Sequence, residues 1–414
     1  MKTSSSIFKK IFFLAFVLSY NSVIGQDTTK FIQRIQKDTG SSKMNMDALY
    51  NRPFLTFNKV PIAIGGYIEA NTNYTTTNGV NDGFHFHIPR MTLFFATTIA
   101  KKIKFIAELE FEEGTKEINI ETGLIDIEFH PLLTFRGGII LNPIGGFNQN
   151  HDGPRWDFID RPLAATEIIP ATLSNVGMGF YGKYFYKNWI FGYEAYFTNG
   201  FNDKLISNEK NRTSFHESKE GNEKFSRSNS GLPMFNGKVA IRNRKWGEIG
   251  ISYLTGVYNE WKKNGLIIDD KRTASIFAID YNTSLFNNKL NITGEVSKAF
   301  IQMPTNYIEN YGRQQLGAFT DFVFTVKQGK ILGWEKAKIN IGARIDFVDH
   351  NIGKFAATNE EIQDHVWAIT PSIAFRPAGM TVLRLNYTYQ LTKDIVGNGP
   401  SKMGSIKFGI SSYF

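Results

Sequence analysis

The stretch Ser405-Ile-Lys-Phe-Gly-Ile-Ser-Ser-Tyr-Phe414 alternates in polarity along its length and ends on an aromatic side chain. In an extended strand, successive side chains point to opposite faces. The more apolar face carries Phe408, Ile410, Ser412 and Phe414. The more polar face carries Lys407, Gly409, Ser411 and Tyr413. A strand with these two faces suits a wall that separates lipid from water.

The same alternation recurs through most of the chain from Pro61 onward. In 102–113, for example, Ile103, Phe105 and Leu109 share one face, whereas Glu108 and Glu110 share the other. Sixteen segments can be read as strands of this kind. They are 61–75, 84–99, 102–113, 118–130, 132–142, 176–187, 189–200, 235–244, 246–257, 272–285, 288–301, 313–328, 336–348, 362–376, 379–392 and 402–414. The prediction is an all-β protein, a transmembrane antiparallel β-barrel of about sixteen strands over residues 61–414.

The connections between these segments mostly alternate in length. Short ones, such as Ala100-Lys101 and His130-Pro131, are followed by longer polar ones. The longer connections are 76–83, 143–175, 201–234, 258–271, 302–312, 349–361 and 393–401. Outer-membrane barrels have short periplasmic turns and longer external loops. A soluble β-sandwich would also alternate in polarity, but its turns would vary in length without this order.

One segment breaks its own alternation. In 118–130, Ile118 and Ile120 fall on the same face as Asp126 and Glu128. An extra residue in the strand would restore the phase, so we expect a β-bulge near Thr122-Gly123.

The N-terminus reads as an export signal. Residues 1–25 combine three lysines, an apolar run from Ile11 to Leu18, and small residues before Gln26, which together predict a cleaved signal peptide. The apolar run is about half of the ~20 residues that a spanning helix needs. We therefore expect export to the bacterial outer membrane. Residues 26–60 could be a periplasmic N-terminal segment or a plug, and the sequence leaves both open.

Composition excludes several classes of protein. The chain has no cysteine, so it has no disulfide and no thiolate site. Its formal charge of +9 falls to about +6 once Lys2, Lys9 and Lys10 of the signal are removed, an excess too small to indicate nucleic acid. Aromatic residues make up 14% of the chain, which argues against disorder.

The connection 143–175, among the longest, concentrates charged, aromatic and proline residues. An ordered loop of this length in a compact protein is usually functional. Its candidate functional residues are His151, Asp152, Arg155, Asp160 and Arg161.

This region resembles a porin family of Bacteroidetes-type bacteria that is related to the phosphate-selective porin O/P group. The residues that carry the resemblance are Arg136-Gly137-Gly138-Ile139, His151-Asp152-Gly153-Pro154, Arg161-Pro162-Leu163, Ile168-Ile169-Pro170 and Gly177-Met178-Gly179. The likeness covers about residues 52–200. It implies that residues 143–175 fold into the lumen and narrow it.

From the wall, Arg90, Glu108, Glu110 and Arg136 are expected to face that loop and complete a constriction. Two plainer interpretations stay open. His151-Asp152 could form a capped turn before Pro154. Arg136 could simply pair with Glu108 or Glu110.

Phosphate selectivity would need an excess of basic residues along the pore. The basic wall candidates are Arg90, Lys104, Arg136, Lys238, Arg242, Arg344, Arg376, Arg384 and Lys407. The acidic ones are Glu69, Glu108, Glu110, Glu194, Glu248, Asp280, Glu295, Asp321 and Asp346. The two sets balance, so a general diffusion pore is favoured over a phosphate-selective one.

Other motifs fail. Gly177-Met-Gly179-Phe-Tyr-Gly182 has dinucleotide-binding spacing but opens a strand, not a helix. His85 and His87 offer two metal ligands without a third, so no metal site is expected. No nucleophile–base motif occurs. The sequence therefore predicts no enzyme activity and no cofactor.

The functional hypothesis is a porin that forms a passive aqueous channel for small hydrophilic solutes, with anions such as phosphate as one option. The alternative is a non-conducting barrel that acts in surface binding or secretion. Expected partners are outer-membrane lipids, lipopolysaccharide and the solutes, without nucleic acid. A homotrimer is suggested by analogy with sixteen-stranded porins.

Overall fold

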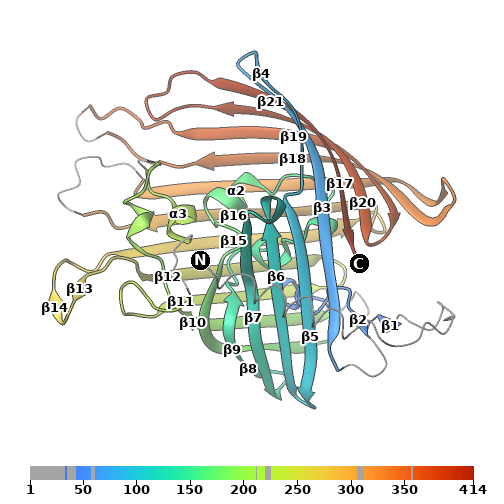
Figure 1. The fold of residues 1–414 in the computed structure, drawn as a ribbon, viewed down its shortest axis with the longest axis horizontal. Coiled ribbons are helices and arrows are strands. Elements are labelled where there is room, and N and C mark those ends of the chain that lie inside the picture. Colours follow the sequence, from blue (N-terminus) through green and yellow to red (C-terminus); the bar gives the residue numbers. More distant parts are fainter. Residues whose placement is uncertain are drawn as a thin grey trace, which may run out of the picture.

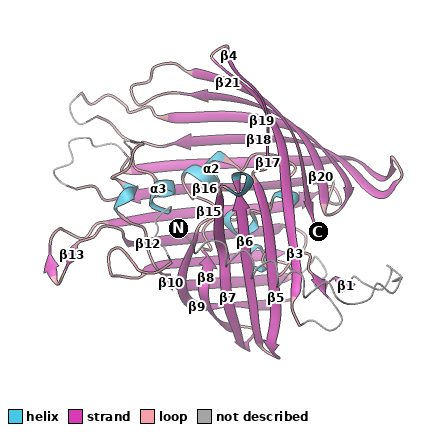
Figure 2. Cartoon of the chain, in the orientation of Figure 1, coloured by secondary structure: helices cyan, strands magenta, loops and turns pink. Residues whose placement is uncertain are grey.

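A closed antiparallel barrel of 16 strands dominates the computed structural model, which describes residues 33–34, 43–56, 61–210, 212–219, 225–304, 312–355 and 358–414 (Figures 1 and 2). Its strands are β3 (Ala63–Thr77), β4 (Val80–His87), β5 (Arg90–Ala100), β6 (Ile103–Glu112), β7 (Glu117–His130), β8 (Leu133–Leu141), β9 (Ser174–Tyr186), β10 (Trp189–Thr198), β11 (Met234–Asn243), β12 (Gly247–Val257), β15 (Thr273–Leu285), β16 (Leu290–Ile301), β17 (Gln314–Ile331), β18 (Trp334–Asp349), β19 (His365–Ala378), β20 (Thr381–Thr392) and β21 (Ser401–Tyr413). Strands β4 and β5 lie end to end along β3 and act as one strand. The predicted signal peptide, residues 1–25, lies outside the described residues.

The ring closes where β21 pairs antiparallel with β3, from Met403 opposite Thr77 to Tyr413 opposite Tyr67. Every other neighbouring pair in the ring follows the order of the chain. The predicted fold class is therefore confirmed. Among the described residues, no helix is long and apolar enough to cross a membrane.

One predicted loop is wrong. Residues 76–83 were expected to connect two strands, but β3 continues to Thr77 and β4 begins at Val80. Asn78 and Gly79 alone make the turn, with φ values of 49° and 85°. Asn-Gly is the dipeptide that best tolerates two positive φ values, so it forms a tight hairpin turn and lets both strands lengthen.

The predicted bulge is confirmed one residue away from its expected place. Glu108 pairs with Thr122, whereas the next residue, Leu109, pairs with Ile120. Glu121 is thus the extra residue in β7. The bulge shifts the phase of β7, so that Ile118 and Ile120 before it and Ile125 after it all face outward.

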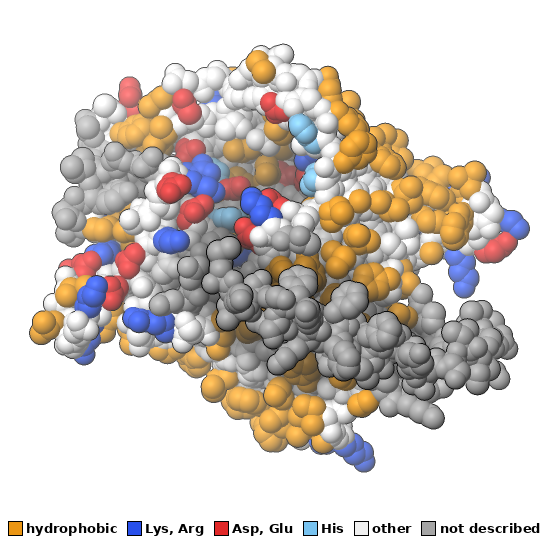
Figure 3. Space-filling view, viewed as in Figure 1, with side chains coloured by type: hydrophobic (Ala, Val, Ile, Leu, Met, Phe, Trp, Pro, Cys, Tyr) orange, Lys and Arg blue, Asp and Glu red, His pale blue; other side chains and the backbone are white. Residues whose placement is uncertain are grey.

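The two faces of the barrel wall differ as the alternation requires. On β21, Phe408, Ile410 and Phe414 are 47%, 41% and 46% exposed, whereas Ser411 and Tyr413 face the interior and are buried. Figure 3 shows hydrophobic side chains spread over the outer wall and charged ones gathered at the loops and in the hollow of the view. Such an outer surface requires lipid contact to be stable.

The interior of the barrel is largely occupied. Residues 142–173, between β8 and β9, fold inward and include η4 (Asn148–Asn150), η5 (Gly153–Arg155) and α2 (Leu163–Glu167). Helix α2 contacts β16, β17 and β18 from inside the ring (Figure 1). Its side chains join an apolar cluster with inward-facing residues of those strands and with α3 (Phe215–Lys219). One side of the lumen is therefore a packed apolar core.

A second segment inside the ring is residues 43–56, which include η2 (Asn45–Asp47) and β2 (Leu55–Thr56). β2 pairs with β1 (Gln33–Arg34) and, through Leu55, with Ile64 of β3. Leu49 and Phe54 pack in a cluster with Tyr67, Phe94 and Tyr413 of the wall. We call residues 43–56 the inner segment and residues 142–173 the inner loop.

A charge on the outer wall tests the lipid-facing assignment. Ile279 lies at the middle of β15, between Ile251 and Val296 on the two neighbouring strands. We expect Ile279→Arg to lower the free energy of unfolding of the barrel in lipid vesicles by about 2–4 kcal/mol, because this position faces the centre of the bilayer. Reversible denaturant titration measures it.

The matched control is Ile267→Arg in the hairpin of β13 (Lys262–Lys263) and β14 (Leu266–Ile267), which lies outside the barrel sheet and is 74% exposed. This variant should change stability by less than about 0.5 kcal/mol, as surface substitutions do. Equal costs for the two variants would contradict the assignment.

Candidate functional site

Charged side chains of the barrel wall hold the backbone of the inner loop. The Glu295 carboxylate accepts hydrogen bonds from the amides of Gly146 (2.7 Å) and Phe147 (3.1 Å). The Asp346 carboxylate accepts from the Leu163 amide at 2.9 Å. A loop in the interior has amides without a regular partner, and burying them unpaired would be costly. The wall carboxylates satisfy them.

Wall arginines do the same for the carbonyl groups. Arg384 donates to the carbonyl oxygens of Gly153 (3.1 Å) and Phe158 (2.8 Å), and Arg376 donates to that of Pro154 (2.8 Å). Gly153 also needs to be glycine, because a Cβ there would collide with the Glu69 carboxylate. The inner loop is thus held in one place from several strands.

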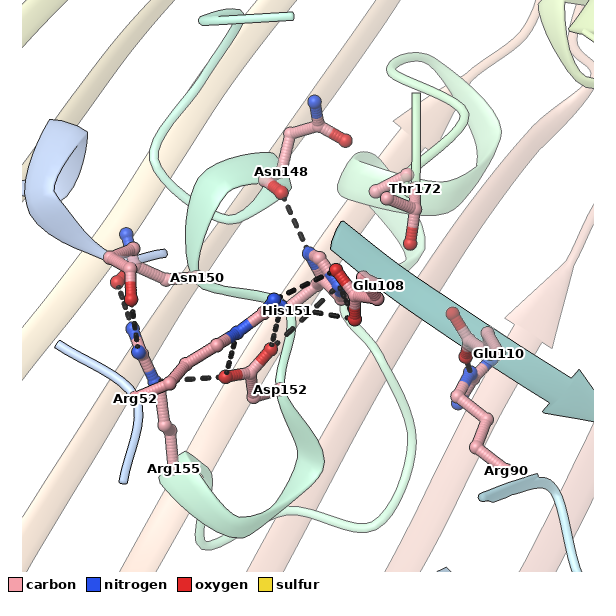
Figure 4. A network of polar contacts seen from close by, with 12 residues as sticks. Arg52, Arg90, Glu108, Glu110, Asn148, Asn150, His151, Asp152, Arg155 and Thr172 are labelled. Atoms are coloured by element: carbon pink, nitrogen blue, oxygen red, sulfur yellow. Dashed lines mark hydrogen bonds and ion pairs between the residues drawn. The ribbon is translucent and has the colours of Figure 1, made fainter. Parts of the chain in front are cut away.

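The inner segment is fixed to both the wall and the inner loop through Arg52. Its guanidinium donates to both oxygens of Glu108 (2.8 and 3.1 Å) and to both oxygens of Asp152 (3.0 and 2.6 Å) (Figure 4). It also lies over the Phe94 ring, 4.0 Å from its centroid. Arginine can make two such forked contacts at once because its donors lie in one plane. Arg52 is 2% exposed, so these charges depend on one another.

Further contacts position the inner segment. The Asn45 amide donates to Glu248, and the Asn45 side chain donates to Asp280 at 3.0 Å. The Tyr50 hydroxyl donates to Asp126 at 2.6 Å, and Lys183 pairs with Asp47 at 2.6 Å. The inner segment therefore contacts β7, β9, β12 and β15, which lie along one arc of the ring.

Four predicted site residues meet around Arg52. Glu108, His151 and Asp152 lie at the centre of this group of side chains. Arg155 lies at the edge of the group and donates a hydrogen bond to the Tyr413 hydroxyl at 3.0 Å. Tyr413 in turn donates to Asp152 at 2.8 Å. The capped-turn interpretation of His151-Asp152 is wrong. The Asp152 side chain precedes η5 but accepts no hydrogen bond from the backbone amides of that helix.

The charge state of Asp152 follows from this setting. Burial acts to raise the pKa of the Asp152 carboxyl, but the adjacent Arg52 guanidinium, together with Arg155, outweighs burial and holds it well below the usual range. Asp152 is therefore ionised at neutral pH, and its ionised form stabilises the fold.

A second group lies beside the first. Arg90 places its Nε 2.9 Å from Glu110 and its NH1 3.4 Å from Glu69. Arg161 lies 3.9 Å from Glu110 and donates to the Ala171 carbonyl oxygen at 3.1 Å. The structure thus brings these predicted residues next to Glu108 and His151.

Two predicted residues lie apart. Arg136 pairs with Asp126 through two 2.8 Å hydrogen bonds, so the expected pairing with Glu108 or Glu110 is wrong. The bulge at Glu121 turns Asp126 to the inner face, and the β7–β8 hairpin pairs it with Arg136. Asp160 pairs with Lys407 at 2.8 Å and has a half-exposed side chain.

The wall charges neutralise one another, as their balance in the sequence predicts. Of the nine basic wall candidates, all but Lys104 have a carboxylate oxygen within 4.0 Å. Lys104 lies over the Tyr50 ring at 5.4 Å. Among the residues that the structure describes, no continuous row of unpaired basic side chains crosses the lumen.

A cavity of about 1390 Å³ lies between the inner segment, the inner loop and the wall, and it reaches the short turns at Pro131 and Gly379. Its lining mixes polar, charged and aromatic side chains, including Asn45, Lys104, Arg155, Lys183, Tyr281 and Asn282.

Sequence reasoning missed Arg52, the residue that joins the two inner parts. It lies in a polar stretch without strand or helix periodicity, so no local signal marks it. Asp126 was missed as the partner of Arg136 because the pairing of β7 with β8 decides which side chains meet, and alternation within one strand does not give that register.

Comparison with known proteins supports the fold. No protein-family model matches the chain. An uncharacterized protein of Aquifex aeolicus is 28% identical over 214 residues, which cover 50% of this chain and 47% of that protein. The match thus spans about half the length of that curated relative.

Two solved structures are similar over most of the chain. The outer membrane channel DcaP of Acinetobacter baumannii has a TM-score of 0.55 at 11% identity, covering 85% of this chain and 97% of its own. An anion-selective porin from Comamonas acidovorans has a TM-score of 0.54 at 10% identity, covering 85% and 99%. At such identities the likeness is one of fold. The chain has the barrel fold of outer-membrane porins, and its apolar outer wall agrees with the predicted location in the outer membrane.

Removing the Arg52 charge should destabilise the barrel. In Arg52→Met, Glu108 and Asp152 stay buried without their shared partner, which we expect to cost about 3–5 kcal/mol in the free energy of unfolding. Denaturant titration of the barrel in detergent measures the change. Lys210→Met is the control, since Lys210 pairs with Glu217 at an exposed site and should cost less than about 1 kcal/mol. Similar costs would show that Arg52 is not an anchor.

The lowered pKa of Asp152 gives a pH dependence. Its charge stabilises the fold fully above its unfolded pKa of about 3.9 and loses this effect as pH falls toward the lower folded value. The stability difference between the parent protein and Asp152→Asn should therefore be largest above about pH 5 and shrink between about pH 4 and pH 2. A difference that stays constant over this range would contradict the assignment.

Proposed function

We propose that this protein is a passive outer-membrane channel for small hydrophilic solutes, narrowed by the inner loop and the inner segment. The observation that carries the proposal is the cavity of about 1390 Å³ between these two segments and the barrel wall, whose lining includes polar, charged and aromatic side chains. A barrel of sixteen strands is wide enough to hold an aqueous path. Segments folded into such a path set the size of the solutes that pass.

The predicted site residues would form the narrow zone. Glu108, Glu110 and Arg90 project from the wall, and His151, Asp152, Arg155 and Arg161 come from the inner loop. Because acids and bases alternate here and pair with one another, the field along the path has little net sign. Selection in this channel would therefore rest mainly on size.

A mild preference for anions is part of the proposal. Lys43, Lys104, Lys183 and Arg242 line the cavity at the short-turn end. Of the described residues there, Lys104 has no carboxylate within ion-pair distance, and its charge is free to attract anions. This arrangement supports small anions as a solute class, whereas the paired interior gives no support to a dedicated phosphate path. We propose a relation to the porin O/P group only as a likeness of architecture, without phosphate selectivity. Assembly as a homotrimer stays a prediction.

One observation supports the alternative function, a non-conducting barrel: the contacts of Arg52. An inner segment that is anchored by two buried carboxylates could keep the lumen closed. The two functions differ in whether the parent barrel passes ions, and in what happens when the inner segment is released.

Single-channel recording in planar bilayers tests the proposal. Replacing residues 44–54 by a Gly/Ser linker of equal length removes the anchors from the lumen while the barrel strands stay unchanged. We expect discrete conductance steps from the parent protein and steps at least about twofold larger from the variant, because the free cross-section of the path increases. In a KCl gradient, the reversal potential should show only weak anion preference.

The control is the same kind of replacement at 262–268, in the hairpin outside the barrel sheet, which should leave conductance unchanged. Heat-modifiable migration in SDS gels confirms that each variant is folded. A folded parent protein and a folded linker variant that both fail to conduct would refute the channel and favour the non-conducting function. Liposome swelling with graded sugars then gives the size limit of an active channel.

A further inference from the structure

The buried imidazole of His151 faces a group of acceptors. Its Nδ1 lies 2.9 Å from the carbonyl oxygen of Asn148, within the same loop. A carbonyl oxygen can only accept a hydrogen bond, so Nδ1 carries a proton and donates it. The other ring nitrogen, Nε2, therefore points away from Asn148, toward the wall of the barrel.

Those surroundings consist of carboxylates. Nε2 lies 3.7 Å from an oxygen of Glu108 and 3.8 Å from an oxygen of Asp152 (Figure 4). One oxygen of Glu108, one oxygen of Glu110 and a ring nitrogen of His151 all lie within 4.8 Å of one another. All three side chains are about 1% exposed or less. A ring nitrogen that faces carboxylate oxygens in a buried place needs a proton or a metal ion between them.

Several atoms around the space between His151, Glu108 and Glu110 have no hydrogen-bond partner. Nε2 of His151 makes no hydrogen bond, and neither carboxylate oxygen of Glu110 accepts one. The nearby arginines do not fill the space. Arg52 holds Glu108 and Asp152 in its two forks, and Arg90 approaches Glu110 at 2.9 Å without directing its Nε–H at the oxygen.

We propose that His151, Glu108 and Glu110 bind one Zn²⁺ ion. One imidazole nitrogen and two carboxylate oxygens are a ligand set that zinc accepts, at about 2.0–2.2 Å from the metal. The 3.7 Å separation between Nε2 and Glu108 is compatible with two atoms bound to the same ion after a small closure. Imidazole favours zinc over Mg²⁺ and Ca²⁺, which prefer oxygen alone.

The outer contacts also fit a metal site. A histidine that binds a metal usually donates its other N–H to a carbonyl or carboxylate, as His151 does to Asn148. The ligating carboxylates are in turn held, Glu108 by Arg52 and Glu110 by Arg90. The metal would join the inner loop to β6, at the position where the inner segment also meets them. This makes it a structural ion of the narrow zone.

The experiment uses the untagged, full-length barrel in detergent after removal of metals with a chelator. Isothermal titration with Zn²⁺ and elemental analysis after dialysis should give one ion per chain, and the thermal unfolding midpoint should rise on zinc addition. X-ray absorption at the zinc edge should show nitrogen and oxygen ligands with an imidazole signature. Failure to bind one zinc ion per chain at submillimolar concentration would overturn the site.

Variants assign the ligands. His151→Gln and Glu110→Gln keep the side-chain volume nearly unchanged and should each weaken zinc binding by at least about tenfold. Glu194→Gln is the matched control, since Glu194 is a buried lumen carboxylate outside the group, and it should leave the affinity unchanged. Heat-modifiable migration shows which variants fold.

The exposed pair His85 and His87 offers another place for zinc. The double variant His85→Gln/His87→Gln should bind zinc like the parent protein. Binding that is lost in this double variant and retained in His151→Gln would overturn the proposal. Should both ligand variants fail to fold, the imidazole signature and stoichiometry of the double His85/His87 variant decide the question.

Discussion

The pairing of β21 with β3 is the constraint on which the rest of the structure depends. In lipid, a strand edge with unpaired amides and carbonyls would have no water to bond, so a membrane-spanning sheet must close on itself. Closure joins the last strand of the chain to the first. It also fixes which side chains face outward, because the alternation in each strand then has one apolar side toward lipid and one side toward the lumen.

Closure also leaves a space inside the ring that has to be filled. A ring of sixteen strands leaves more space than the wall side chains can fill. Here that space takes up the inner loop and the inner segment. Their irregular backbones need hydrogen-bond partners, and the wall provides them. Carboxylates such as Glu295 accept hydrogen bonds from backbone amides, and arginines such as Arg384 donate to backbone carbonyl groups. The charges of the lumen are therefore used largely to hold polypeptide, and few are left to attract solutes.

Arg52 shows how these parts depend on one another. It comes from the inner segment, yet its two partners come from β6 and from the inner loop. A buried charge of this kind adds little net stability by itself, but removing it leaves two carboxylates unpaired. His151 lies beside the same two carboxylates, so three separate parts of the chain have to fit together around Arg52.

The sequence by itself determined the all-β barrel, the approximate positions of its strands apart from the 76–83 hairpin, and the bulge in β7, because these follow from the two-residue alternation that any strand between lipid and water must have. It also predicted that the loop after the fifth strand contributes to a site in the lumen. Only the tertiary structure decided that Arg136 pairs with Asp126, that Arg52 anchors the interior, and that His151 faces Glu108 and Glu110. Those contacts join residues that are distant in the chain. They depend on register, and on where irregular segments settle inside the ring, for which local sequence carries no periodic signal.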